Sequence, residues 1–334
     1  MERKVEKQSQ KKSQKLIDAI REEQAKENKR FPIIRNTLSP YKEMFSWLNS
    51  FTINFLKRDA SSSLASSLPM ESFLALIDNL APERIDRRVR DKAGPFFNQG
   101  NEIGIILVHG FSSTAQEMQE LGEFIHEQTG FTSLSILLAG HGTSPADLAQ
   151  TDMIDWYKSV KEAYDFLKET CKKIALVGHS MGGTLSLVLA ANEEVDAVVS
   201  LCTPIKVEYF MQDYIHLVND LLQYFPRRKE EIELMDKNHL INYRISSLKA
   251  VEHMLDLMEI AREEIKKVKS PIFTITAGKD ERVPLHNAQK IHELVQSEIK
   301  EDYFFENAIH TILHDEKKHA VFDKILAFLK SILE

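Results

Sequence analysis

The chain has 334 residues, of which 43% are hydrophobic and 28% are charged, a typical balance for one large globular domain or two small ones. No apolar run approaches the roughly 20 residues that a membrane span requires, so the pattern is not that of a membrane-spanning protein. The N-terminus Met1–Lys4 opens a polar stretch without the apolar core of a signal peptide. We therefore expect a soluble cytoplasmic protein.

Charge and glycine content divide the chain near Ala93. Residues 1–93 carry 19 Lys and Arg against 13 Asp and Glu, a balance of +6, whereas the remaining residues carry 24 against 37, a balance of −13. All 12 glycines lie in the second part, between Gly94 and Gly278. The composition therefore predicts an N-terminal extension over residues 1–93 and a separate domain over residues 94–334.

The N-terminal extension has the pattern of an arm followed by two amphipathic helices. Residues 1–30 are dense in Lys, Glu and Gln, which indicates a solvated arm. Apolar residues recur on one helical face at 41–57 and again at 70–80, with a serine-rich stretch between. We expect these faces to pack on the second domain; the alternative is peripheral membrane contact through the apolar face around Trp47.

After residue 94, short β-rich apolar runs alternate with helical patterns. This alternation is typical of an α/β fold with a mostly parallel sheet and helices on both faces. The expected strands are Ile103–Val108, Ser133–Leu138, Ile174–Val177, Ala197–Cys202, Ile272–Ala277 and Tyr303–Phe305. The alternation stops once, over residues 204–270, where we find helical patterns and no strand signal. An apolar helical stripe runs from Val207 to Phe225 within it, so we expect a helical cap over a ligand crevice.

The two cysteines are expected to be free thiols. Cys171 precedes one predicted strand and Cys202 ends the next, so in a parallel pair they lie at opposite ends. A strand of this length spans roughly 17–20 Å, whereas a disulfide requires Cα atoms within about 7 Å. Free thiols agree with a reducing compartment.

The strongest motif is the sequence GHSMGG at residues 178–183, which lies between an expected strand and an expected helix. This is the context of a G-x-S-x-G nucleophile elbow, in which the serine is held in a strained turn above the sheet edge. The glycines allow close approach of the backbone, and the following helix places its positive end near the hydroxyl. We therefore expect Ser180 to be a nucleophile.

A serine nucleophile needs a base, and the base needs a carboxylate that orients it. Asp280 follows the strand Ile272–Ala277 and is favoured over the neighbouring Glu281 because it lies nearer the strand end. Three late histidines are candidates for the base. His310 lies in a loop after the last expected strand, whereas His314 and His319 belong to the approach and start of the final helix. We expect a catalytic triad of Ser180, Asp280 and His310 and no metal site.

The oxyanion hole requires two backbone N–H groups that point at the developing charge. Met181, directly after the nucleophile, is one expected donor. The loop after the strand Ile103–Val108 should supply the other, from Phe111, because Gly110 permits close approach. His109 and His179 lie beside these groups and are interpreted as structural hydrogen-bonding residues.

These motifs resemble those of bacterial carboxylesterases and monoacylglycerol lipases of the α/β-hydrolase superfamily. The matching segments are HGF at 109–111, GHGT at 140–143, GHSMGGT at 178–184 and KDERVP at 279–284. The resemblance runs from about residue 95 to the C-terminus and includes the cap, but it does not extend to the N-terminal extension. In this family the base lies shortly before an acidic pair, and HDEK at 314–317 matches that pattern. The resemblance therefore strengthens His310 over His314, although Ala308 and Ile309 replace the Ser-Gly of many relatives.

The resemblance implies hydrolysis of a small lipid-like carboxylic ester through an acyl-enzyme, without metal or cofactor. The expected partner is a small-molecule ester, with no nucleic acid. A lysophospholipase or acyltransferase on the same scaffold is the main alternative. A non-catalytic binding module that docks on a membrane or protein is a second alternative, disfavoured because all three triad residues are present. Acyl-chain length, head group, pathway and oligomeric state stay open.

Overall fold

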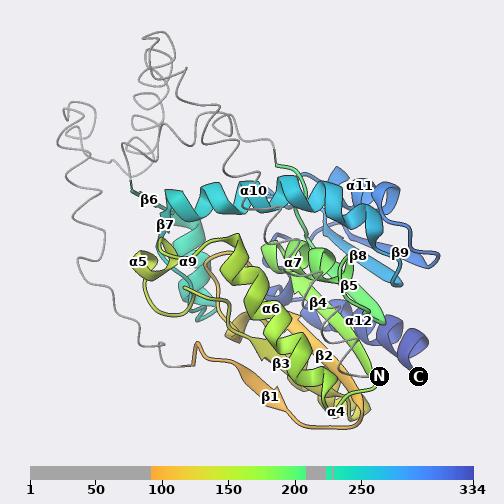
Figure 1. Ribbon diagram of the computed structural model, residues 1–334. Coiled ribbons are helices and arrows are strands. Elements are labelled where there is room, and N and C mark those ends of the chain that lie inside the picture. The colour runs from red at the N-terminus through yellow and green to blue at the C-terminus, as the bar shows by residue number, and fades with distance from the viewer. Residues whose placement is uncertain (1–91, 208–222, 228) are drawn as a thin grey trace, which may run out of the picture.

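The computed structural model describes residues 92–207, 223–227 and 229–334. Residues 1–91 of the predicted N-terminal extension lie outside the described residues, as does the apolar stripe between 208 and 222. The described part forms a seven-stranded sheet between two layers of helices (Figure 1). The predicted α/β class, with a mostly parallel sheet covered on both faces, is confirmed.

The main sheet has the strand order β1-β3-β2-β4-β5-β8-β9. Its strands are β1 (Phe96–Asn98), β2 (Ile103–Val108), β3 (Thr132–Ile136), β4 (Lys173–His179), β5 (Ala197–Leu201), β8 (Ile272–Ala277) and β9 (Lys300–Phe305). Only β1 runs antiparallel to its neighbour. The six predicted strands are present with small shifts of their ends. The edge strand β1 was not predicted, because three residues are too few to show a period of two.

Each face of the sheet buries its own apolar core. The helices on one face are α6 (Met153–Lys168), α7 (Met181–Ala190), α10 (Leu248–Glu264) and α11 (His286–Leu294). Those on the other face are α4 (Gln116–Thr129) and α12 (Lys318–Leu333). Strand side chains alternate between the two cores: Ile106 of β2 lies in the first and Ile105 in the second. The remaining helices are short: α5 (Pro145–Leu148), α9 (Lys229–Lys237), η3 (Ile265–Lys267) and η4 (Ile312–His314).

Local sequence signals explain the ends of the helices that flank the site. Helix α6 begins at a capping box in which the Asp152 side chain accepts the Asp155 N–H while Asp155 accepts the Asp152 N–H. Helix α4 ends at Gly130, whose φ of 70° lies in the left-handed region that favours glycine. The start of α6 and the end of α4 are therefore set by residues at the helix ends themselves.

The cap contains two short strands in addition to helices. β6 (Tyr224–Pro226) pairs antiparallel with β7 (Ile245–Ser247), and helices α9 and α10 follow the two strands. The expectation of an all-helical insertion is therefore wrong at this point, since the end of the apolar stripe at Phe225 is a strand. Aromatic and β-branched residues favour strands, but a three-residue strand is masked by a neighbouring helical pattern.

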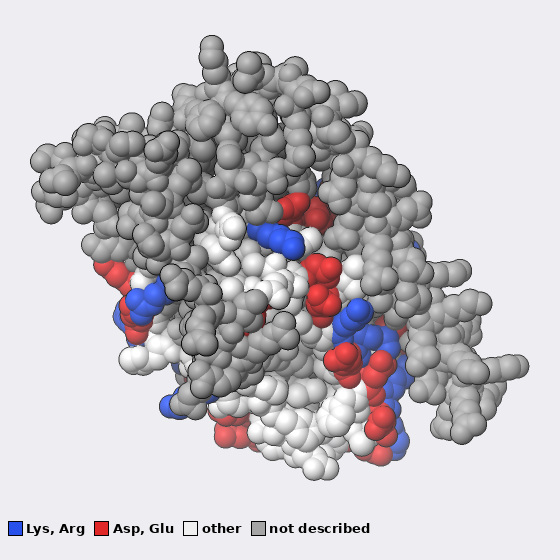
Figure 2. Space-filling view, turned by 60° about the vertical axis from the view of Figure 1, so that its left-hand side comes forward, with Lys and Arg blue, Asp and Glu red and all other residues white. Residues whose placement is uncertain are grey.

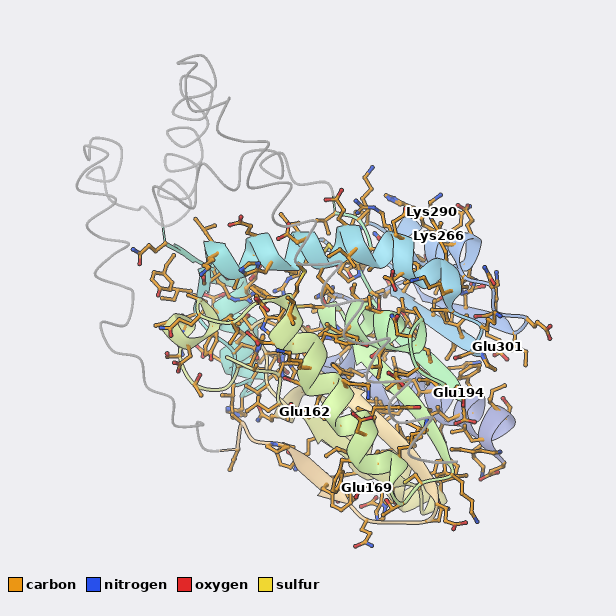
Figure 3. All side chains as sticks on the ribbon, in the orientation of Figure 1. Glu162, Glu169, Glu194, Lys266, Lys290 and Glu301 are labelled. Atoms are coloured by element: carbon orange, nitrogen blue, oxygen red, sulfur yellow. The ribbon has the colours of Figure 1, made fainter. Side chains whose placement is uncertain are left out.

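Charged side chains cover the outside of the domain. Figure 3 labels six of them, all exposed: Glu162, Glu169, Glu194, Lys266, Lys290 and Glu301. On the face shown in Figure 2, acidic and basic side chains are interspersed.

None of the described helices is long and apolar enough to cross a membrane. Both cysteines are buried and free, as predicted.

Candidate active site

The sequence-predicted site residues meet at one edge of the sheet, where the parallel strands end. Ser180 follows β4, Phe111 lies just past β2, and Asp280 lies just past β8. His310 follows β9, the strand beside β8. The carboxyl ends of parallel strands form the usual crevice for ligands in open α/β sheets.

Ser180 occupies a strained turn between β4 and α7. Its φ of 51° and ψ of −124° are unusual for a residue with a side chain, and its N–H donates to the Leu201 carbonyl at 2.8 Å. A Cβ on Gly178 would lie 2.4 Å from the Gly182 carbonyl oxygen, and one on Gly182 would lie 2.2 Å from the Val108 carbonyl oxygen. Both positions therefore require glycine, which explains the motif.

Hydrogen bonds connect Ser180, His310 and Asp280 in a line. His310 Nε2 lies 3.1 Å from Ser180 Oγ, and His310 Nδ1 lies 2.7 Å from Asp280 Oδ2. The other carboxylate oxygen of Asp280 accepts the N–H groups of Arg282 at 2.8 Å and Val283 at 2.9 Å. The carboxylate is therefore held from both sides, and the geometry is that of a nucleophile, a base and an orienting acid.

The competing candidates lie elsewhere. Glu281 is exposed, although it directly follows Asp280. His314 ends the short helix η4 instead of entering the final helix, which begins at Lys318. His319 is exposed on α12, where its ring packs edge-on against Phe322.

Burial and neighbouring charges set the protonation of His310 and Asp280. Burial lowers the pKa of His310, the hydrogen bond that His310 donates to Asp280 opposes this, and the charge of His179 lowers it further. Burial alone would raise the pKa of Asp280, but the hydrogen bond and charge of His310 bring it below its ordinary value. A neutral His310 beside an ionised Asp280 is the form that can accept a proton from serine.

Two side chains fix the loop that follows β2. Gly110 donates its N–H to Glu117 Oε2 at 2.7 Å, and its carbonyl oxygen accepts from His109 Nδ1 at 2.8 Å. His109 Nε2 accepts the Leu138 N–H at 3.1 Å, so Nδ1 carries the hydrogen. Because C=O and N–H point in opposite directions across a trans peptide, the His109 contact orients the N–H of Phe111.

The other predicted donor, the Met181 N–H, is the first of helix α7. The first N–H groups of a helix have no partner within the helix, and they lie at the positive end of its dipole. One expected oxyanion donor is therefore oriented by the His109 side chain, and the other by the start of helix α7.

Glu117 was not predicted from the sequence; it is buried in the first turn of α4 with a relative exposure of 6%. Its Oε2 lies 3.2 Å from Nδ1 of His179. A signal for it exists in the sequence, since Glu117 stands four residues before Leu121 and therefore on the apolar face of the helix. A charge on that face, seven residues after Gly110, indicates a buried partner.

Among the described residues, one group of side chains could hold a metal ion. Ligand atoms of His179, Cys202 and His310 lie within 4.8 Å of one another. The ring nitrogens of both histidines already contact protein atoms, His310 those of Asp280 and Ser180, and His179 those of Glu117 and the His310 backbone. A metal would have to displace these contacts.

The cap docks directly on the loop that follows β2. The Tyr243 N–H donates to the Ser112 carbonyl at 3.2 Å. The Tyr243 hydroxyl donates to the Gly140 carbonyl and accepts from the Thr143 N–H, both at 2.9 Å. The Tyr243 side chain is buried, so one cap residue connects the loop after β2 to the loop after β3.

A chain of charged contacts links the cap to the loop that carries Asp280. Glu231 Oε2, in α9, lies 3.0 Å from Arg227 Nη1 and 3.2 Å from Arg282 Nη2. The Arg227 Nη2 in turn donates to Ser112 Oγ. The cap therefore contacts the loops on both sides of Ser180.

Comparison with known proteins finds two bacterial enzymes that are similar over most of their length. The chain is 26% identical over 242 residues to a carboxylesterase of Bacillus subtilis (strain 168), covering 71% of this chain and 96% of the relative. It is 27% identical over 237 residues to a thermostable monoacylglycerol lipase of Bacillus sp. (strain H-257), covering 71% of this chain and 94% of the relative.

Solved structures share the fold. A structure reported with LipS and LipT, two metagenome-derived lipolytic enzymes, has a TM-score of 0.67 and 25% identity, covering 73% of this chain and all of that one. The Paleococcus ferrophilus monoacylglycerol lipase has a TM-score of 0.62 and 20% identity, covering 71% of this chain and 98% of that one. The model of the family described as serine aminopeptidase, S33, matches residues 101–317, which is more than half of the chain. The protein therefore belongs to the S33 family of the α/β-hydrolase superfamily.

Proposed function

We propose that this protein is a serine esterase that hydrolyses carboxylic esters of small lipid-like substrates through an acyl-enzyme. The observation that carries the proposal is the line of hydrogen bonds from Ser180 through His310 to Asp280, built on a strained elbow at the sheet edge. The carboxylesterase and monoacylglycerol lipase relatives support esters as the substrate class.

In the first step Ser180 Oγ attacks the ester carbonyl while His310 Nε2 takes its proton. The resulting imidazolium is stabilised by Asp280 and then protonates the alcohol as it leaves. In the second step water attacks the acyl-enzyme with His310 again acting as base, and the carboxylic acid is released. All of these steps use groups of the chain and water.

The negative charge that develops on the carbonyl oxygen needs donors that are in place before the reaction. The N–H groups of Phe111 and Met181 are the proposed pair, because one is oriented by His109 and the other opens helix α7. Loss of a single oxyanion donor in comparable sites lowers kcat by about 10² to 10³.

A fluorophosphonate probe tests the nucleophile directly, because it reacts only with an activated serine. We expect the wild-type protein to be labelled and Ser180→Ala to be unlabelled, with an unchanged melting temperature. Ser331→Ala, on the far helix α12, is the matched control and should label like wild type. A wild-type protein that resists the probe would favour a non-catalytic binding module.

The substrate class is tested with a chain-length series of p-nitrophenyl esters and monoacylglycerols. We expect the wild-type protein to hydrolyse these esters and Ser180→Ala to lose the activity, with a fall of about 10⁴ or more in kcat. Lysophospholipids and an aminoacyl p-nitroanilide complete the panel. Faster cleavage of a lysophospholipid would assign the lysophospholipase alternative, and faster cleavage of the anilide would assign a peptidase.

A further inference from the structure

A buried ion pair lies directly behind the proposed triad and takes no part in the mechanism described above. Glu117 Oε2, in the first turn of α4, lies 3.2 Å from Nδ1 of His179, the last residue of β4. The two side chains are only 5% and 3% exposed. Removing two opposite charges from water costs free energy unless both form further contacts. The other contacts of Glu117 and His179 therefore indicate what the pair does.

Each member of the pair holds one of the loops that carry the chemistry. Glu117 Oε2 also accepts the N–H of Gly110, the residue before the oxyanion donor Phe111, at 2.7 Å. His179 Nε2 lies 2.9 Å from the backbone carbonyl oxygen of His310, to which it donates, and the two imidazole rings are 5.1 Å apart. The pair therefore joins the oxyanion loop to the loop of the base through one contact.

The charge state of the pair follows from its surroundings. Burial alone would lower the pKa of His179, but the Glu117 carboxylate and the Cys202 thiol raise it well above 6.5. Burial alone would raise the pKa of Glu117, but the charge and hydrogen bond of His179 hold it well below its ordinary range. His109 and His314 also lie near the pair but have lowered pKa values, mainly through burial.

We propose that Glu117 and His179 are positioning residues that act as one unit, holding the Phe111 donor and the His310 base in register with Ser180. This inference rests on the proposed esterase function. Neither residue touches the triad side chains through a hydrogen bond; Glu117 acts through Gly110 and His179 through the His310 backbone.

The unit has an electrostatic effect in addition to its geometric one. The charged groups that face His310 are Asp280, His179 and Arg282, of which the last two disfavour the protonated ring. Because the cationic His179 ring lies 5.1 Å from the His310 ring, its charge keeps the base neutral to lower pH. Replacing His179 removes that charge directly, and replacing Glu117 disfavours it, because the Glu117 carboxylate is the largest cause of the raised pKa of His179.

Two polar substitutions that keep the hydrogen bonds separate this role from simple packing. Glu117→Gln keeps an acceptor for the Gly110 N–H and removes the carboxylate charge. His179→Gln keeps a donor for the His310 carbonyl and removes the imidazolium. Glu120→Gln, which removes a half-exposed acid on the same helix, is the matched control. Kinetics on a soluble p-nitrophenyl ester, from pH 4 to 9, and melting temperatures are measured for all three.

Both single variants are expected to move the acid limb of kcat/KM upward by about one pH unit. At the optimum, kcat should fall by about tenfold with KM unchanged, because the unit holds the donor and the base and does not bind substrate. The control should match wild type. The double variant Glu117→Gln/His179→Gln should shift the limb no further than either single variant, since each one already removes the same pair.

Several results would overturn the inference. If the acid limb did not shift in either variant, the pair would have only a packing role, even if the melting temperature fell. Shifts that add in the double variant would show two independent residues. If one single variant does not fold, the pH profile of the other decides the question. Failure of the proposed function is distinct, because wild type would then not hydrolyse the ester or react with fluorophosphonate.

Discussion

The Nδ1 atom of His310 lies 2.7 Å from the Oδ2 atom of Asp280. A carboxylate only accepts hydrogen bonds, so this contact places the ring hydrogen on Nδ1. Nε2 is then left with a lone pair directed at Ser180 Oγ, 3.1 Å away. The Asp280–His310 contact therefore selects the tautomer that can act as a base.

Asp280→Asn should lower kcat by about 10⁴ with little change in stability, because an amide donates to Nδ1 and stabilises the wrong tautomer. The measurement is the steady-state kinetics of ester hydrolysis. Glu281→Gln is the control and should stay close to wild type, since Glu281 is exposed beside the loop. A larger loss from Glu281→Gln would transfer the role of the acid to the neighbouring residue.

His310→Ala and His314→Ala should differ sharply, although the two residues lie four positions apart. His310 contacts both Ser180 and Asp280, whereas His314 ends the short helix η4. We expect a loss of at least about 10³ in kcat for His310→Ala and a change within about threefold for His314→Ala. Comparable losses in the two variants would refute the assignment of the base.

The acid limb of the pH profile should lie below 6.5, the ordinary pKa of histidine. Burial lowers the pKa of His310, and His179 lowers it further, so neutral base persists to lower pH. Activity is therefore present above the lowered pKa and is lost as the pH falls through it. The measurement is kcat/KM of a non-ionising ester substrate against pH, and a midpoint above 6.5 contradicts it.

Tyr243→Phe should destabilise the protein by about 0.5–1.5 kcal/mol, because the partly buried Thr143 N–H and Gly140 carbonyl lose their shared partner. The measurement is urea denaturation of the full chain. Tyr303→Phe is the control, since the Tyr303 side chain is partly exposed on the edge strand β9. Equal stability of the two variants would show that the hydroxyl of Tyr243 contributes nothing to the docking of the cap.

Much of the central fold could be predicted from the sequence because its signals are local. Buried parallel strands such as β2 and β8 are short apolar runs, and the bounds of both were predicted to the residue. The elbow at Ser180 requires glycine on both sides for steric reasons, so the turn can be recognised from the sequence motif alone. The placement of Asp280 and His310 followed from strand ends that share one edge of the sheet.

Other features depend on contacts between distant segments and were missed. The strands β1 and β6 have three residues each, and their identity as strands depends on the partners they pair with. Glu117 owes its importance to His179, which is far away in the chain and becomes its neighbour only when α4 packs on β2 and β3 and β4 pairs with β2. The predicted faces of the N-terminal extension lie outside the described residues, so their packing stays a prediction.

The docking of residues 239–243 on the loop after β2 also affects how such enzymes can be recombined. The Ile241 N–H donates to the Gln116 side chain, and Ser113 donates to the Asn242 side chain, in addition to the backbone contact of Tyr243. A chimera that receives only a foreign cap would lose these partners and disturb the segment that carries Phe111. Exchange of substrate preference between relatives therefore requires that residues 111–116 be transplanted together with the cap, as a single cassette.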